Sequence, residues 1–214
     1  MRPKFLHAWY RTHWGRKHSV LDFFDIFAFL LFIAGIAWVI RFFVFMPYTV
    51  EGTSMAPTFH DKDFIVVDKM TPKYGSLKRG DVVVFVPPGK DIPFIKRIVW
   101  LPWETVKLQS GKVYICSNTT GTNVCKALTE PYIASDIQTD ARCGVTTFDV
   151  KDWYFVMGDN RWYSTDSRCC FGLWCTSGSS YTVMQDRVIG KVSLRMYPSP
   201  TSFNNESAQY KTTK

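Results

Sequence analysis

The chain has 214 residues, of which 46% are hydrophobic and 21% are charged. This balance is typical of a folded protein and excludes intrinsic disorder over most of the length, and a mean hydropathy of −0.07 excludes a multi-span membrane protein. Five of the eight excess positive charges lie within residues 1–18, which contain no acid. Because nucleic-acid binding requires a basic face on the folded part, it is not expected here.

An apolar stretch follows the basic segment and runs from Phe23 to Met46, with Asp25 and Arg41 as its charged residues. As a helix it would rise about 36 Å at ~1.5 Å per residue, which is enough for a ~30 Å hydrocarbon core. The sequence Met46-Pro47-Tyr48 lacks the small residues of a cleavage site, so a removable leader is disfavoured. We therefore predict a basic cytoplasmic tail over residues 1–20 and one transmembrane anchor over residues 21–46. The alternative is a buried core helix.

Charge predicts the orientation of this anchor. Positively charged flanks stay in the cytoplasm, so we expect a single-pass protein of the plasma membrane with a cytoplasmic N-terminus and an extracytoplasmic domain. An even number of cysteines in an oxidising compartment favours disulfides over free thiols, and either Cys169 or Cys170 is spaced to close a short loop with Cys175. The six cysteines, all after the apolar stretch, are Cys116, Cys125, Cys143, Cys169, Cys170 and Cys175.

Residues 47–197 are predicted to form one β domain. Short runs rich in β-branched and aromatic residues alternate with Gly, Pro and Asp turns, and no amphipathic helices separate them, which favours an antiparallel sandwich or folded barrel over a parallel sheet. Residues 116–150 are less regular and are expected to be a cysteine-bearing insertion, whereas residues 198–214 are expected to be a polar tail. The predicted strands are Phe64–Val67, Asp81–Val86, Phe94–Val99, Val106–Leu108, Lys112–Ile115, Trp153–Met157 and Val188–Leu194.

Ser54 lies in a Gly-containing turn shortly after the predicted anchor. Such a serine is either an exposed nucleophile or, more commonly, a hydroxyl that caps the backbone. A nucleophilic serine needs a base, and His60 is the one histidine of four that follows the anchor. Because the domain has so few histidines, a Ser-His-Asp triad is disfavoured, and a neutral lysine is the alternative base.

Lys96 is the lysine whose neighbours suit a base. A basic lysine must be desolvated, because lowering its pKa from ~10.4 to ~8 costs about 3 kcal/mol. Strand alternation places Lys96 on the same face as Phe94 and Ile98, whereas most of the other lysines of the domain have polar or turn neighbours. The alternative is a lysine that protects an exposed edge strand from aggregation.

The segment from Met157 to Arg168 gathers Gly, Asp, Asn, Ser and Arg directly after an apolar strand. Aspartate and arginine can lock together in such a turn, and a hydroxyl can orient an amine. The segment is thus either a brace for a functional site or an elaborate hairpin loop.

Together these segments resemble the ordered sequence boxes of type I signal peptidases, and the resemblance covers about residues 21–197. It implies a membrane-bound serine endopeptidase with an all-β catalytic domain behind one N-terminal anchor, as in the one-anchor members common in Gram-positive bacteria. The family removes signal peptides from exported preproteins with a Ser-Lys dyad. The boxes are Ser54-Met55 with Pro57-Thr58, Gly80–Phe85, Lys96–Val99 with Leu101-Pro102, Gly158–Arg161, and Ser164 with Asp166, Ser167 and Arg168.

By this resemblance Ser54 is the nucleophile and Lys96 the general base, and the Ser54 N–H is one donor to the oxyanion. Ser164 would orient the lysine amine. The remaining supporting residues would be Asp166 with Arg168 as an ion pair, and Asp159 with Arg161 as residues that shape the turn.

Two departures from the family pattern stand out. Gly52 occupies a position where some members have a hydroxyl that serves as the second oxyanion donor. Trp100 and Trp103 replace the glycines usual in the family, and glycine often marks positive φ or a close backbone approach. We therefore expect altered packing beside the strand that carries Lys96.

Signal peptides end in small residues, which need shallow apolar pockets, and the predicted wall residues are Val50, Met55, Phe94 and Ile95. The expected partners are preproteins with signal peptides and the lipid bilayer, with the secretion translocon as a further candidate. No cofactor and no metal are expected, because zinc-spaced His and Cys pairs and phosphate-binding glycine motifs are absent from the sequence. The alternatives are a relative that matures a single pilus or conjugation protein, and a catalytically inactive module that binds signal peptides.

Overall fold

The computed structural model describes residues 18–119, 122–173, 175 and 180–203. The chain divides into two compact units, with the boundary between residues 44 and 45. The first unit contains helix α1 (His18–Val39) and a π-helical turn, η1 (Ile40–Val44). Its large apolar side chains from Phe23 to Ile40 are exposed. Among the helices within these described ranges, none has the length and apolar character needed to cross a membrane. The predicted anchor over residues 21–46 is therefore not confirmed, and most of the predicted tail lies outside the described residues.

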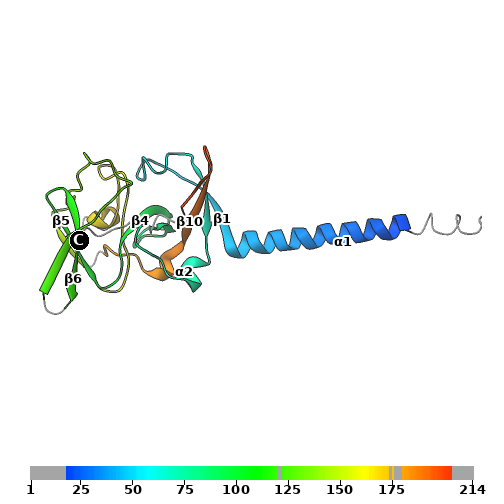
Figure 1. Ribbon diagram of the computed structural model, residues 1–214, viewed down its shortest axis with the longest axis horizontal. Coiled ribbons are helices and arrows are strands. Elements are labelled where there is room, and N and C mark those ends of the chain that lie inside the picture. Colours follow the sequence, from blue (N-terminus) through cyan, green and yellow to red (C-terminus); the bar gives the residue numbers. More distant parts are fainter. Residues whose placement is uncertain (1–17, 120–121, 174, 176–179, 204–214) are drawn as a thin grey trace, which may run out of the picture. The chain divides into compact units, whose positions relative to one another are not determined.

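The second unit is built on two antiparallel sheets (Figure 1). The larger sheet has the order β1-β2-β10-β3-β4-β9, with β11 paired to β10, and the smaller has the order β7-β6-β5-β8. The strands of the larger sheet are β1 (Phe45–Thr49), β2 (Phe64–Asp68), β3 (Val82–Phe85), β4 (Phe94–Trp100), β9 (Phe155–Met157), β10 (Val188–Tyr197) and β11 (Thr201–Ser202). Those of the smaller sheet are β5 (Glu104–Gln109), β6 (Lys112–Thr119), β7 (Thr122–Ala127) and β8 (Thr147–Val150). Short helical segments are α2 (Thr71–Tyr74), η2 (Ser167–Gly172) and η3 (Gln185–Arg187).

The larger sheet is covered on both faces, and β3 shows this most clearly. All four of its residues are buried. Val82 and Val84 pack in one apolar cluster and Val83 and Phe85 in another, as expected for a strand whose side chains alternate between two covered faces. A third cluster joins the end of β4 at Trp100 to the smaller sheet. β4 pairs with β3 on one side and with β9 on the other, so Lys96 lies inside the larger sheet and not at its edge.

The antiparallel all-β prediction is confirmed, and every predicted strand run overlaps an observed strand. Strand β1 was not predicted, because Phe45 and Met46 continue the apolar run that was predicted to be helical. Pro47 cannot continue a helix, and β1 is an edge strand of its sheet, where proline is tolerated.

Residues 116–150, the predicted cysteine-bearing insertion, contribute β7 and β8 to the smaller sheet. The start of the predicted polar tail likewise packs on the domain, because β11 pairs with β10 and Phe203 is buried. Residues 204–214 lie outside the described residues.

All six cysteines form disulfides, as predicted. Of the two candidates for the short loop, Cys170 is the partner of Cys175, and Cys169 bonds to Cys143 instead. The third pair joins Cys116 and Cys125 across neighbouring strands β6 and β7. The Cys143–Cys169 disulfide ties the chain between β7 and β8 to η2, which begins within the polar segment from Met157 to Arg168.

Candidate active site

Ser54 lies in the loop that connects the edge strand β1 to β2. The base of the loop is closed by two main-chain hydrogen bonds, from Val50 N–H to the Asp63 carbonyl (2.9 Å) and from Lys62 N–H to the Val50 carbonyl (2.8 Å). Gly52 has φ = +86°, a left-handed conformation that glycine adopts without steric cost, and its N–H donates to Asp61 Oδ1 at 2.8 Å. The positive φ that this turn requires therefore explains why a glycine stands at position 52, where some family members have a hydroxyl residue.

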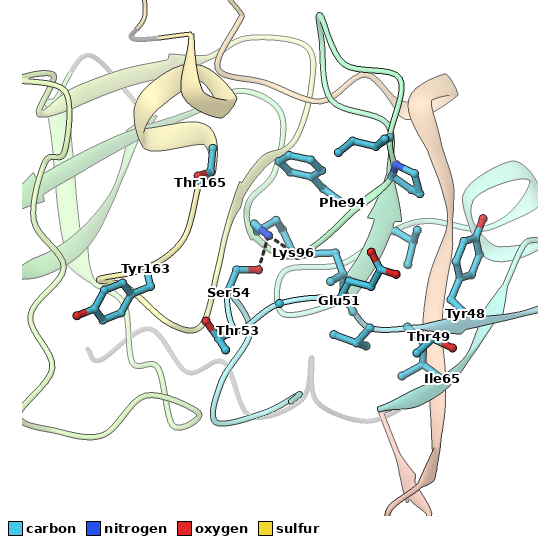
Figure 2. A pocket seen from close by; sticks show the side chains of 16 residues that line it. Tyr48, Thr49, Glu51, Thr53, Ser54, Ile65, Phe94, Lys96, Tyr163 and Thr165 are labelled. Atoms are coloured by element: carbon cyan, nitrogen blue, oxygen red, sulfur yellow. Dashed lines mark hydrogen bonds between the residues drawn. The ribbon is translucent and has the colours of Figure 1, made fainter. Parts of the chain in front are cut away.

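The side chain of Lys96, on strand β4, contacts Ser54. Its Nζ lies 2.7 Å from Ser54 Oγ and 2.7 Å from the carbonyl oxygen of Ile95 (Figure 2). β4 lies between β3 and β9, so the reading of Lys96 as an edge-strand lysine is wrong. The side chain is 3% exposed.

Burial sets the protonation of Lys96. Desolvation lowers the pKa of Lys96 to about 8, although the nearby carboxylates of Asp166 and Asp159 act in the opposite direction. The Phe94 ring lies 5.3 Å from Nζ and contributes to the apolar surroundings. A large fraction of the amine is therefore neutral just above neutral pH, and its lone pair can then accept a proton from the Ser54 hydroxyl.

The Ser54–Lys96 pair lies in a cavity of about 590 Å³. Three of the four predicted wall residues, Val50, Phe94 and Ile95, line it. Met55 does not, because its side chain is 1% exposed and packs in the core cluster beneath the loop. The further lining residues, which were not predicted as wall residues, are Tyr48, Thr49, Glu51, Gly52, Thr53, Ile65, Val84, Ile92, Pro93, Tyr163 and Thr165.

The turn after β9 packs directly on the Ser54 loop. Asn160 donates from its backbone N–H to the Ser54 carbonyl and from Nδ2 to the Thr53 carbonyl, both at 3.1 Å. A Cβ added to Gly158 would lie 2.4 Å from the Ser54 carbonyl oxygen and 2.1 Å from Ser164 Oγ. Glycine is thus required for the close approach of the two loops.

Ser164 is buried at this junction, but the predicted hydrogen bond to the lysine is not present. Within the described part of the chain, Ser164 Oγ makes no hydrogen bond to Lys96, and its hydroxyl acts instead on the Asp166 carboxylate, whose pKa it helps to lower. Lys96 Nζ instead donates to the Ile95 carbonyl, which is one residue away on the same strand.

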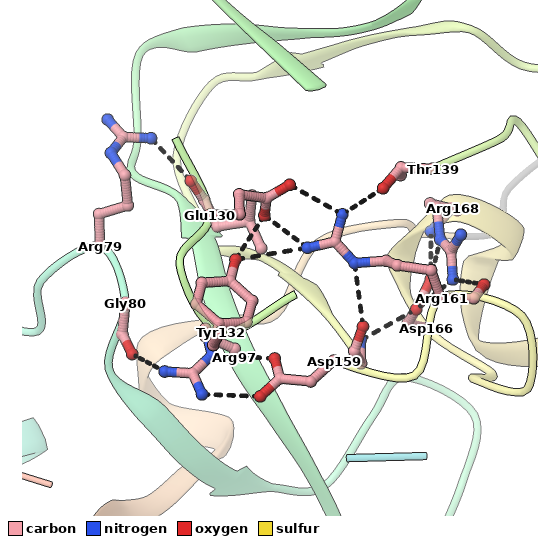
Figure 3. Close-up of polar contacts among 12 residues, drawn as sticks. Arg79, Gly80, Arg97, Glu130, Tyr132, Thr139, Asp159, Arg161, Asp166 and Arg168 are labelled. Atoms are coloured by element: carbon pink, nitrogen blue, oxygen red, sulfur yellow. Dashed lines mark hydrogen bonds and ion pairs between the residues drawn. The ribbon is translucent and has the colours of Figure 1, made fainter. Parts of the chain in front are cut away.

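Two buried ion pairs support the turn (Figure 3). Arg168 contacts both carboxylate oxygens of Asp166, through Nε at 3.0 Å and Nη2 at 2.9 Å, which is the predicted pair. Burial alone would raise the pKa of Asp166, but the Arg168 charge and hydrogen bonds outweigh this effect and hold the pKa below its ordinary value. Because Asp166 also accepts from Gly158 N–H at 3.1 Å, the pair fixes the start of the turn.

Asp159 and Arg161 do not pair with each other. Asp159 binds Arg97 through two contacts of 2.9 and 2.7 Å and accepts from the Thr58 hydroxyl at 2.6 Å. Arg97 follows Lys96 on β4, so strand alternation directs it away from the cavity. No role was predicted for Arg97, although an arginine next to the proposed base in a strand-like run was the available signal.

Arg161 forms a separate buried cluster with residues of the predicted insertion. It donates to Glu130 at 3.0 Å and to the Tyr132 hydroxyl at 3.3 Å, and the Tyr132 ring lies 4.0 Å from the Arg97 guanidinium carbon. Tyr132 therefore connects the two arginines, a link that no local pattern could predict because it joins segments about 30 residues apart.

The two unusual tryptophans have different environments. Trp100 is fully buried in the cluster that joins β4 to the smaller sheet. Trp103 is 78% exposed and has φ = +71°, which agrees with the expectation that the glycine usual at this position marks positive φ. Neither residue lines the cavity.

A serine hydroxyl beside a buried lysine of lowered pKa, within an apolar cavity, is the arrangement of a serine hydrolase that uses lysine as its base. In the described ranges, no group of three His, Cys, Asp or Glu side chains is arranged to hold a metal ion.

Sequence comparisons define the family. Residues 23–197 match the family described as signal peptidase, peptidase S26, and the chain therefore belongs to the signal peptidase family of serine endopeptidases. It is 36% identical over 170 residues to signal peptidase I T of Bacillus subtilis (strain 168), covering 76% of this chain and 79% of the relative. It is 40% identical over 168 residues to a signal peptidase I of Bacillus amyloliquefaciens, covering 75% and 83%. A solved signal peptidase I from Enterococcus faecalis V583 matches with a TM-score of 0.36 and 23% identity, over 55% of this chain and 97% of that one.

Proposed function

We propose that this enzyme removes N-terminal signal peptides from exported preproteins, with Ser54 as the nucleophile and Lys96 as the general base. The observation that carries the assignment of the dyad is the 2.7 Å separation of Lys96 Nζ from Ser54 Oγ in a buried, apolar setting. Family membership supports the substrate class.

The proposed reaction proceeds through an acyl-enzyme. Ser54 Oγ attacks the scissile carbonyl carbon while its proton moves to neutral Lys96. The protonated lysine then gives this proton to the leaving amine, and the C–N bond breaks. Lys96 next takes a proton from a water molecule as the water oxygen attacks the ester carbonyl carbon. The bond from this carbon to Ser54 Oγ then breaks, Lys96 returns the proton to Ser54 Oγ, and the signal peptide leaves with a new C-terminal carboxylate.

The residues around the dyad support two further roles. The Ser54 N–H makes no hydrogen bond to another described residue, so it is available to the oxyanion, and Thr53 lines the cavity beside it as the candidate second donor. Ser164 is the proposed positioning residue for the lysine, because its hydroxyl is buried at the junction with the Ser54 loop and its oxygen can accept a hydrogen bond from the ammonium that forms during turnover. The ion pairs of Asp166 and Asp159 would hold these groups in place.

We also propose that α1 attaches the enzyme to the plasma membrane with its N-terminus in the cytoplasm. The exposed apolar side chains between Phe23 and Ile40 and the basic residues of segment 1–17 support this orientation, since positive flanks remain cytoplasmic.

The function is tested by incubating the full-length protein in detergent with a preprotein that has small residues at the first and third positions before its cleavage site. We expect a single cut, with the new N-terminus at the first residue of the mature protein, and the alternative of a binding module predicts none. Cleavage of one pilus or conjugation preprotein but of no other exported preprotein would identify the specialised relative instead.

The same reaction should depend on pH in a defined direction. The neutral form of Lys96 is the base, and with a pKa of about 8 its fraction rises about tenfold between pH 7 and pH 9. We therefore expect kcat/KM to increase by about this factor and to level off above pH 9. A profile that is flat from pH 6 to pH 10 would contradict a titrating amine.

A further inference from the structure

We propose that Glu51 makes the enzyme select preproteins that carry a lysine or arginine close to the scissile bond. The inference rests on the proposed function, because it concerns the specificity of the same cavity. It adds a charge preference to the expected preference for small residues.

Glu51 is the one carboxylate among the residues that line the cavity, and Lys96 is the one lysine or arginine. Figure 2 shows Glu51 beside the dyad, three residues before the nucleophile in the chain. Lys96 must be neutral when Ser54 attacks. In the productive state, Glu51 is therefore the single formal charge among the described lining side chains.

No described side chain neutralises Glu51. Lys62 is held at the same loop base through its bond to the Val50 carbonyl, but its ammonium is oriented toward Asp61 at 3.9 Å. Asp61 in turn accepts from Gly52 N–H. The neighbouring charges of the loop are thus engaged with each other, whereas Glu51 is exposed to the cavity and takes part in none of the ion pairs of the described residues.

The main-chain groups of Glu51 also make no main-chain hydrogen bond to the described residues. Val50 directs both of its main-chain groups toward the segment 62–63. In an extended chain the main-chain groups of the next residue point to the opposite side. The N–H and carbonyl of Glu51 make no main-chain hydrogen bond to the described residues, so an extended peptide that pairs with them would place its own side chains next to the carboxylate.

The expected size of the charge preference follows from the solvent exposure of the Glu51 side chain. An ion pair that remains in contact with water contributes about 0.2–1 kcal/mol, which corresponds at 1.4 kcal/mol per tenfold to a preference of up to about fivefold. We expect this preference to fall toward one at 1 M salt, where the screening length is about 3 Å.

The test is a set of preprotein peptides that differ at one position at a time, with small residues kept at the first and third positions before the cut. Each of the other positions from five before to two after the cut carries Lys, Met or Glu in turn. The matched length of Met and Lys isolates the charge. We measure kcat/KM with the full-length enzyme in detergent at low salt, for the wild type, Glu51→Gln, Glu51→Lys and the control Asp186→Asn, which removes one exposed carboxylate outside the cavity.

We expect at least one position where the Lys peptide is cleaved about threefold to fivefold better than the Met peptide and the Glu peptide worse. Glu51→Gln should bring the Lys-to-Met ratio near one, Glu51→Lys should invert it, and Asp186→Asn should retain the wild-type ratio. The inference is overturned if no position shows a preference, if 1 M salt leaves the wild-type ratio unchanged, or if Glu51→Gln keeps it. Failure of the proposed function itself would be distinct, because the wild type would then cleave none of the peptides, the Met peptide included.

Discussion

Ser54→Ala is expected to abolish preprotein cleavage while leaving the fold intact. The substitution removes the Oγ that lies 2.7 Å from Lys96 Nζ, so no acyl-enzyme can form. Loss of the nucleophile in a serine protease typically reduces kcat by about 10⁶-fold. Because Ser54 is half-buried and loses one hydrogen bond, the cost to the free energy of unfolding should be about 1 kcal/mol.

The measurement is the rate of preprotein cleavage, with thermal unfolding of the same samples followed by tryptophan fluorescence. Ser76→Ala serves as the matched control, because Ser76 is an exposed serine outside the cavity and should leave the rate unchanged. Cleavage by the Ser54→Ala protein at more than a few per cent of the wild-type rate would assign the nucleophile to another residue.

Lys96→Met is expected to be inactive and at the same time more stable than the wild type at neutral pH. The variant keeps the length of the side chain but has no amine, and loss of a general base costs about 10²–10⁴-fold in rate. The stability effect follows from burial, which lowers the pKa of Lys96 to about 8 from an unfolded value of ~10.4. Protonating this buried amine at pH 7 opposes folding by about 3 kcal/mol.

The sign of the pH dependence distinguishes this explanation from simple repacking. Between about pH 8 and pH 10.4 the unfolded state holds a proton that the folded state lacks, so the stability of the wild type rises with pH. The penalty is fully present below pH 8 and disappears above about pH 10.4. The stability gain of Lys96→Met, measured by denaturation of the full-length protein in detergent, should therefore shrink over this range.

Lys96→Arg separates the loss of the base from the loss of the charge. Arginine cannot lose its proton near neutral pH, so this variant should be as inactive as Lys96→Met but should show no gain in stability. Turnover by Lys96→Arg would exclude Lys96 as the base, and a stability gain of Lys96→Met that is independent of pH would exclude a desolvated ammonium.

The buried ion pairs give the site its shape more than its net stability. Breaking a buried pair leaves an uncompensated charge, and Asp159 and Asp166 also act on Lys96, because their charges raise the pKa that burial lowers. The pKa of about 8 thus reflects a balance between an apolar cavity and two carboxylates that are themselves neutralised by Arg97 and Arg168.

Local patterns in the sequence were sufficient to predict the β class and the positions of most strands, and they marked Ser54 and Lys96 as candidates that the family resemblance then joined in a proposed dyad. Alternation along Phe94–Val99 placed Lys96 on an apolar face, and the turn chemistry around Gly158 and Ser54 marked the two loops. These features depend on residues that are neighbours in the chain, so periodicity and turn propensity report on them directly.

The tertiary structure decided which of these residues meet. The resemblance assigned Asp159 and Arg161 only to shaping the turn, and the fold pairs Asp159 with Arg97 and Arg161 with Glu130. Met55 was expected at the cavity wall and lies in the core instead. Contacts of this kind depend on the register of strands far apart in the chain, which local preference does not determine.

What the sequence alone determined is therefore the type of chemistry: a serine, a lysine in an apolar strand, and two turns rich in polar groups, in the order of the signal peptidase family. The tertiary structure determined the geometry that this chemistry needs. It brought Lys96 within 2.7 Å of Ser54, buried the amine, and left the carboxylate of Glu51 facing the cavity without an ion-pair partner among the described residues. The physical reason is that burial and charge balance are properties of the packed fold, since they depend on every element that surrounds a side chain.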